Sequence, residues 1–142
     1  MPKLNGRFFF QKTDNGNLIG EFSNNLDPNI STESADCKKG CENKECVDCK
    51  WHGTYHTSWQ EECDALFAEL KIFHKKGSAK LFSLAWCRNN IPPNNIPPIQ
   101  KNLIFVGEGM LCNGMLIGDY RPPNDAEKSA HLRANPQPIT CP

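Results

Sequence analysis

Two Asn-Gly dipeptides, one near each end of the chain, constrain its fold more than any other feature. Asn15-Gly16 separates residues 7–12 from residues 17–22, and Asn113-Gly114 precedes the apolar segment 115–120. Asn-Gly readily adopts the two positive φ angles of a type I′ turn, which joins antiparallel strands. Each pair therefore predicts a β-hairpin.

Alternating side chains between these hairpins predict further strands, because successive residues of a strand point to opposite faces. Two sets of residues each share one face: Tyr55, Thr57 and Trp59 in the first, and Phe82, Leu84 and Trp86 in the second. Glycines at 107, 109, 114 and 118 fall in or beside the last strands, as is typical of curved sheets and small barrels. We therefore expect an all-β antiparallel meander that closes into a small barrel.

Residues 59–76 fit two structures. Ser58 and Glu61 have the spacing of a helical capping box, and lysines precede Gly77, which favours a helix and an α+β fold. The alternation of Leu66, Ala68, Leu70 and Ile72 favours a strand instead, followed by a turn at residues 75–78. We favour the strand and keep the helix as the alternative.

Three stretches lack a regular apolar pattern. Residues 24–50 are polar and cysteine-rich, residues 91–98 are rich in proline, and residues 122–142 show no apolar period. The proline-rich stretch is expected to lengthen a hairpin loop. The expected organisation is one β domain over residues 1–121, with a cysteine-rich loop insert at about 24–50, followed by an irregular C-terminal tail at 122–142.

Charge and hydropathy limit the partners of this chain. Sixteen basic and sixteen acidic residues give a formal net charge of zero, so no overall field attracts nucleic acid or an anionic membrane. No stretch approaches the ~20 apolar residues that cross a bilayer, and the first residues lack a signal-peptide core. We expect neither nucleic-acid nor membrane binding. The expected location is the cytoplasm, or the secretory route if a leader was removed and the cysteines are oxidised.

Eight cysteines are many for a cytoplasmic chain, and without a signal peptide reduced thiols or metal ligation are favoured over disulfides. Four lie within thirteen residues and are candidate zinc ligands: Cys37, Cys41, Cys46 and Cys49. The spacing from Cys41 onward also fits the first three ligands of an iron–sulfur site, with Cys87 as a distant fourth. A loop with free or oxidised cysteines explains the same cluster without a metal.

Aromatic residues are the main candidates for binding a small molecule. Tyr55, Trp59 and Trp86, on strands that each offer one aromatic-rich face, could line an apolar pocket, although core packing also explains such rings. The sequence contains no nucleophile elbow, phosphate-binding glycine loop or HExxH motif. We therefore assign no catalytic residue.

Several short segments together resemble small avidin-like and lipocalin-like meander barrels. They are residues 6–9 (GRFF), 53–55 (GTY), 82–90 (FSLAWCRNN) and 105–109 (FVGEG). The resemblance implies a barrel whose mouth holds a small, often hydrophobic ligand, with Trp86, Tyr55 and Trp59 near that pocket. The insert around Cys37 to Cys49 and the proline-rich loop depart from the family pattern.

Two functional hypotheses follow. The first is a β-barrel that binds a small hydrophobic molecule without catalysis. The second is a protein-interaction module in which zinc, held by the cysteines of residues 37–49, orders the insert for a protein partner.

Overall fold

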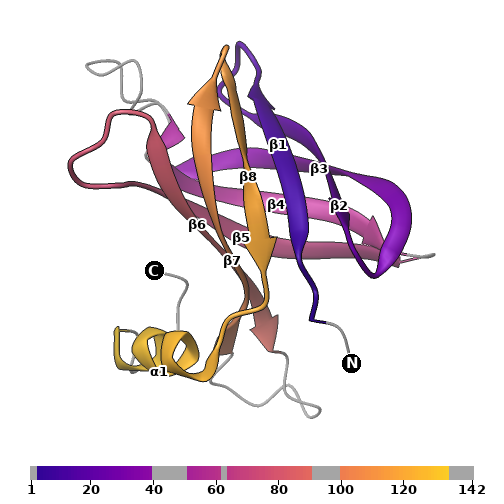
Figure 1. The fold of residues 1–142 in the computed structure, drawn as a ribbon, viewed down its shortest axis with the longest axis vertical. Coiled ribbons are helices and arrows are strands. Elements are labelled where there is room, and N and C mark those ends of the chain that lie inside the picture. The colour runs from indigo at the N-terminus through magenta and orange to yellow at the C-terminus, as the bar shows by residue number, and fades with distance from the viewer. Residues whose placement is uncertain (1–2, 40–50, 62–63, 91–99, 135–142) are drawn as a thin grey trace.

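The computed structural model describes residues 3–39, 51–61, 64–90 and 100–134 of the chain. Its strands are β1 (Gly6–Lys12), β2 (Leu18–Asn24), β3 (Asp27–Lys39), β4 (Gly53–Glu61), β5 (Asp64–His74), β6 (Leu81–Asn90), β7 (Gln100–Cys112) and β8 (Met115–Arg121). Each strand pairs antiparallel with the next, and β8 pairs with β1 to close a barrel (Figure 1). The prediction of an all-β antiparallel meander barrel is confirmed.

The turn between β7 and β8 has the predicted geometry. Asn113 and Gly114 have φ angles of 51° and 78°, and Cys112 pairs directly with Met115 on either side of them. This is the two-residue reversal expected for Asn-Gly, with both central residues in the left-handed region. The hairpin near the C-terminus therefore forms as the sequence indicates.

The turn between β1 and β2 differs from the prediction, although the hairpin itself is present. Lys12 pairs with Leu18, which leaves five residues in the loop, and Gly16 alone among them has a positive φ, of 83°. Thr13 closes the loop, because its amide donates to the carbonyl of Asn17 and its hydroxyl accepts from the Asn17 amide. The predicted type I′ turn at Asn15-Gly16 was therefore wrong, since local threonine bonding sets a longer loop.

The ambiguous segment 59–76 is extended, as favoured. β5 pairs with β4 from Asp64 to Ile72 and with β6 from Glu69 to His74, so a helix here would leave one edge of β4 and one edge of β6 unpaired. Leu70 and Ile72 point into the barrel and are fully buried. The helical alternative was wrong because the spacing of Ser58 and Glu61 falls within β4.

The prediction that residues 24–50 are irregular was wrong for residues 27–39, which form β3. The inward side chains of its second half are Glu33, Ala35 and Cys37, of which the first two are buried. A carboxylate, a methyl group and a thiol produce no visible apolar alternation. The strand is instead set by its pairing with β2 and β4.

The predicted irregular tail contains a helix, α1 (Asp125–Ala134). Asn124 caps it: its side-chain oxygen accepts from the Glu127 amide at 2.8 Å, and the Glu127 carboxylate accepts from the Asn124 amide at 2.9 Å. Arg121 donates two hydrogen bonds to the same carboxylate. This reciprocal cap begins the helix without any apolar stripe. The described helix is too short to cross a membrane.

Side chains fill the half of the barrel nearest the β1–β2 and β7–β8 turns. Rings and branched chains with at most 2% exposure occupy it: Phe10, Leu18, Tyr55, Leu70, Ile72, Phe82, Leu84 and Leu116. Trp51 closes this end, since its carbonyl accepts from the Tyr55 hydroxyl at 2.9 Å and its ring lies 5.8 Å from the Lys12 ammonium. An eight-stranded barrel is just wide enough for such a filling.

Two of the cysteines in the described residues are oxidised. Cys37 and Cys87 are each disulfide-bonded, whereas Cys112 is a free, exposed thiol. The preference for reduced or metal-bound thiols was therefore wrong at Cys37 and Cys87. That preference came from a rule about cellular compartments, and sequence spacing contains no direct signal of oxidation.

Thiol counting tests this assignment. In denaturant without reductant, we expect Cys37→Ser to raise the number of reactive thiols by one per chain, because the partner sulfur loses its bond. The matched variant Cys112→Ser should lower the number by one. A fall of one thiol in Cys37→Ser would show instead that Cys37 is a free thiol or a metal ligand, because either would react with the reagent after denaturation.

Candidate ligand-binding cavity

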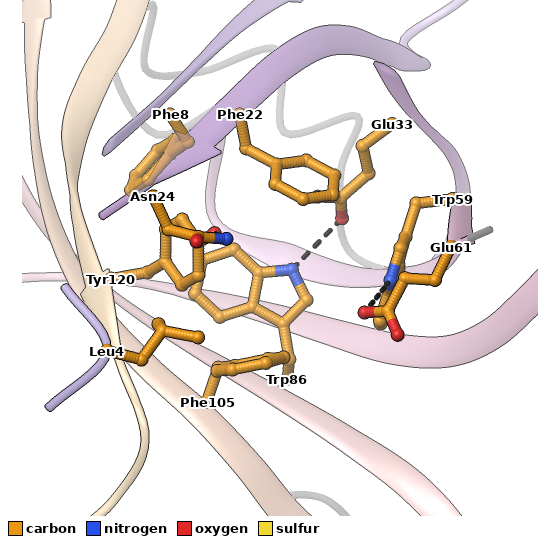
Figure 2. Close-up of a pocket in the computed structure, with 10 residues that line it drawn as sticks. All are labelled: Leu4, Phe8, Phe22, Asn24, Glu33, Trp59, Glu61, Trp86, Phe105 and Tyr120. Carbon is orange, nitrogen blue, oxygen red and sulfur yellow. Dashed lines mark hydrogen bonds between the residues drawn. The ribbon is translucent and has the colours of Figure 1, made fainter. Parts of the chain in front are cut away.

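The opposite end of the barrel, where β1 begins and β8 ends, contains a cavity of about 60 Å³. It is several times larger than the space that one water molecule requires. Ten residues line it, contributed by every strand except β5 and by the segment before β1 (Figure 2): Leu4, Phe8, Phe22, Asn24, Glu33, Trp59, Glu61, Trp86, Phe105 and Tyr120. Phe8, Glu33 and Trp86 are buried, whereas Glu61 is exposed at the rim.

Tyr120 is the centre of the aromatic wall. Its ring centroid lies 5.9 Å from that of Phe22 and 5.4 Å from that of Phe105, both nearly perpendicular to it, and 6.2 Å from that of Trp86. Phe22 also contacts Trp59 edge to face at 6.5 Å. Such contacts fix the rings relative to one another, so the wall is held in shape without a ligand.

Glycines make room for these large rings. Gly6 pairs with Tyr120 across the β1–β8 seam, and a Cβ atom on Gly6 would overlap the tyrosine ring. A Cβ atom on Gly107 would lie 3.2 Å from the Trp86 ring and 2.5 Å from the backbone oxygen of Asp119. The missing side chain at Gly107 therefore permits close approach of the Trp86 ring and of β8. The role of Gly6 was not foreseen, because its pairing with Tyr120 is set by closure of the barrel.

Glu33 is the one acidic side chain on the floor of the cavity among the described residues. It is 7% exposed, and its Oε2 atom accepts hydrogen bonds from the Thr57 hydroxyl and, at 3.0 Å, from the indole nitrogen of Trp86. Burial raises the pKa of Glu33 from 4.5 to about 7, and the two hydrogen bonds oppose that rise. Burial therefore moves the titration of this carboxyl group toward neutral pH.

The rim repeats the pairing of an indole with a carboxylate. The indole nitrogen of Trp59 donates to Glu61 at 3.1 Å, as the second dashed line in Figure 2 shows. Beside it, the side-chain amide of Asn24 donates to the Tyr120 hydroxyl at 3.1 Å. Burial, followed by the nearby acidic side chains, raises the pKa of Tyr120, so its phenol stays neutral and keeps a proton that it can donate.

The lining chemistry is apolar and anionic. Among the described residues that line the cavity, two are carboxylates, Glu33 and Glu61, and none is lysine, arginine or histidine. Six are aromatic. A few convergent polar groups in a mostly apolar wall are typical of small-molecule sites.

Two of the three aromatic candidates from the sequence lie in this wall. Trp59 and Trp86 line the cavity, and their role in ligand binding stays a prediction. Tyr55 is fully buried in the filled half and is bonded to Trp51, so the structure does not bring it to the cavity. Sequence reasoning missed Glu33 and Tyr120. Glu33 had no signal in an apparently irregular segment, whereas the alternation of residues 115–120 could have placed Tyr120 inside.

The predicted zinc site lies mostly outside the described residues, which exclude Cys41, Cys46 and Cys49. Cys37 is described and is disulfide-bonded, and a disulfide sulfur is not a thiolate ligand. Within the described ranges, no group of three or more histidine, cysteine or acidic side chains could hold a metal ion. A zinc site that uses Cys37 is therefore not formed, whereas zinc binding by the other three cysteines stays a prediction.

Comparison with known proteins gives no match, whether to a family model, to a curated protein or to a solved structure. The closed eight-stranded meander is the architecture that avidin-like and lipocalin-like barrels share, but membership of either family stays a prediction. The function has to be argued from the cavity itself.

Glu33 makes stability depend on pH in a defined direction. Between pH 4.5 and about 7 the carboxyl group of the unfolded chain ionises while that of the barrel stays protonated, so the free energy of unfolding falls as the pH rises. The full loss is about 3 kcal/mol for a shift of this size. Urea denaturation at pH 4.5 and pH 8 should show that loss in the native protein and not in Glu33→Gln.

The matched control is Glu21→Gln, which changes an exposed carboxylate on the same hairpin. Other groups titrate in this range, so the quantity of interest is the difference between each variant and the native protein. We expect Glu21→Gln to follow the native pH dependence. An equal pH dependence in Glu33→Gln would contradict a raised pKa at Glu33.

Proposed function

We propose that this protein binds a small molecule, without converting it, in the aromatic cavity at the end of the barrel where β1 begins. The observation that carries this proposal is the contrast between the two halves of the interior. One half is filled by buried side chains, while in the other six aromatic residues surround a cavity. Rings that line a cavity have surface that a ligand can contact.

The residues of the cavity wall can both bind a ligand and orient it. Phe8, Phe22 and Phe105 provide apolar surface, and Glu33 and the Tyr120 hydroxyl provide hydrogen-bonding groups at separate points. This composition suits a ligand with an apolar body and at least one polar group. Because the rings stand on paired strands and contact one another, little ordering is required when the ligand binds.

Access is from the rim. Glu61 is exposed, and Leu4, Phe22, Asn24 and Phe105 are partly exposed, so the cavity reaches the surface at this end. The filled half closes the other end with Trp51. The resemblance to avidin-like and lipocalin-like barrels, which hold small ligands in the barrel mouth, supports the same location.

A carboxyl group with a pKa near neutrality would also suit a general acid or base. Binding and catalysis differ in what happens to the bound compound. Recovery of the compound unchanged after long incubation with the protein is the outcome that binding requires.

The test is a thermal-shift and fluorescence screen against benzyl alcohol, benzylamine, indole and biotin-like compounds. A compound at 100 times its Kd should stabilise the protein by about 2.7 kcal/mol, which raises Tm by roughly 5 to 10 °C. It should also change the emission of Trp59 and Trp86, whereas Trp51 at the far end should be unaffected. No stabilisation by any compound, with tryptophan emission constant, would refute the proposal.

A cavity-filling variant locates the site. Leu4→Trp is expected to place a large ring in the mouth and to abolish binding of any compound found in the screen. Its matched control is Ile19→Trp, which adds the same ring to a residue that is 51% exposed on β2 and does not line the cavity. Retained binding in Leu4→Trp would show that the compound binds elsewhere.

A further inference from the structure

We propose that the ligand is a small protonated amine, with its ammonium group against Glu33 on the cavity floor and its apolar body among the aromatic rings. This inference rests on the proposed binding function and names the chemical class of the ligand.

The hydrogen bonds of Glu33 leave one oxygen for a ligand. Thr57 and Trp86 both donate to Oε2, and no residue in the described ranges donates to Oε1. Glu33 lines the cavity, so its side chain is in a position to meet a ligand there. A carboxylate oxygen can only accept hydrogen bonds. A ligand that reaches the cavity floor is therefore expected to donate a hydrogen bond to this oxygen.

The two protein groups that bond Glu33 are both donors. An indole nitrogen has no acceptor capacity, so Trp86 can bond this side chain solely through an acceptor oxygen. Two donors on one oxygen stabilise the ionised form over the neutral acid, and both lower the pKa of Glu33 against the effect of burial. The immediate surroundings are thus arranged for a carboxylate.

Among the described residues that line the cavity, none places a cation beside that carboxylate. No described lining residue carries a positive charge, and the second carboxylate, Glu61, adds to the negative potential of the mouth. Buried charges in proteins are ordinarily paired, because an unpaired one loses its hydration without compensation. An ammonium group would supply the missing partner, and an anionic ligand would be repelled.

The rings favour the same ligand. The aromatic rings of Trp86 and Tyr120 lie with their centroids 6.2 Å apart on the wall that Glu33 joins. The face of an aromatic ring attracts a cation within about 6 Å, most strongly when water is excluded. A protonated amine gains from both the carboxylate and the rings, whereas a neutral alcohol of the same shape gains mainly from apolar contact.

The experiment compares three probes that share one ring and differ in charge: benzylamine, benzyl alcohol and benzoate. Calorimetry is carried out at pH 8, where Glu33 is ionised and benzylamine is largely protonated. We expect benzylamine to bind at least tenfold more tightly than benzyl alcohol, and benzoate not to bind detectably.

Two variants test whether Glu33 causes the difference in affinity between benzylamine and benzyl alcohol. Glu33→Gln keeps an acceptor for Thr57 and Trp86 and removes the charge, so benzylamine should bind at least tenfold more weakly while benzyl alcohol changes less than twofold. Glu21→Gln, on the outer surface of β2, should leave the affinity of both probes unchanged. Unchanged near-ultraviolet circular dichroism shows that each variant is folded.

A pH series on the native protein gives a second readout. Lowering the pH from 8 to 5.5 protonates Glu33 and should weaken benzylamine but not benzyl alcohol. The other titratable groups that face Glu33 across the cavity are Glu61 on β4 and Tyr120 on β8. Tyr120 stays neutral throughout, because burial raises its pKa. The variant Glu61→Gln measures how much of the pH effect on benzylamine binding comes from the rim carboxylate.

The outcomes separate this inference from the proposed function. If a neutral compound binds and benzylamine binds no better, or if Glu33→Gln does not affect benzylamine, the amine assignment is overturned and the cavity remains a binding site. If no compound of the screen binds, both fail. Selective loss of benzylamine in Glu33→Gln and at low pH supports the amine.

Discussion

The pairing of β1 with β8 is the constraint on which the rest of this structure depends. It removes both sheet edges and fixes the width of the interior at eight strands. The same seam places Gly6 opposite Tyr120, so the tyrosine ring can lie across β1 toward the rings that it contacts. The pairing that closes the barrel therefore also assembles the cavity wall. The local sequence around Gly6 or Tyr120 does not reveal this pairing.

The sequence patterns that predicted strands were those set by the filled half of the barrel. Leu70 and Ile72 alternate with outward residues because they point into the hydrophobic core, and Phe82 and Leu84 do the same on β6. Trp86 continues that alternation into the cavity, which is why it could be identified as a candidate. Tyr55 shared the pattern but lies deeper in the barrel, because alternation indicates the face of a strand and not the depth along it.

The sequence predictions that were wrong have physical causes of three kinds. β3 was missed because its inward side chains include Glu33, so the apolar pattern breaks where the site is built. α1 begins with the reciprocal cap of Asn124 and Glu127, a signal that was present but lacked an apolar stripe to accompany it. The oxidation of Cys37 depends on tertiary approach of two sulfurs, which spacing cannot supply. Departures from pattern are expected at functional sites.

Stability alone does not account for a carboxyl group at position 33. The indole nitrogen of Trp86 needs an acceptor on the cavity floor, and the amide oxygen of a glutamine would provide one without any cost of ionisation. A glutamate satisfies the same donor but carries a charge that burial disfavours, as its raised pKa shows. What the carboxylate adds over the amide is negative charge facing an accessible cavity. That charge becomes favourable when a cation is bound beside it, which is the role proposed for the ammonium group of the ligand.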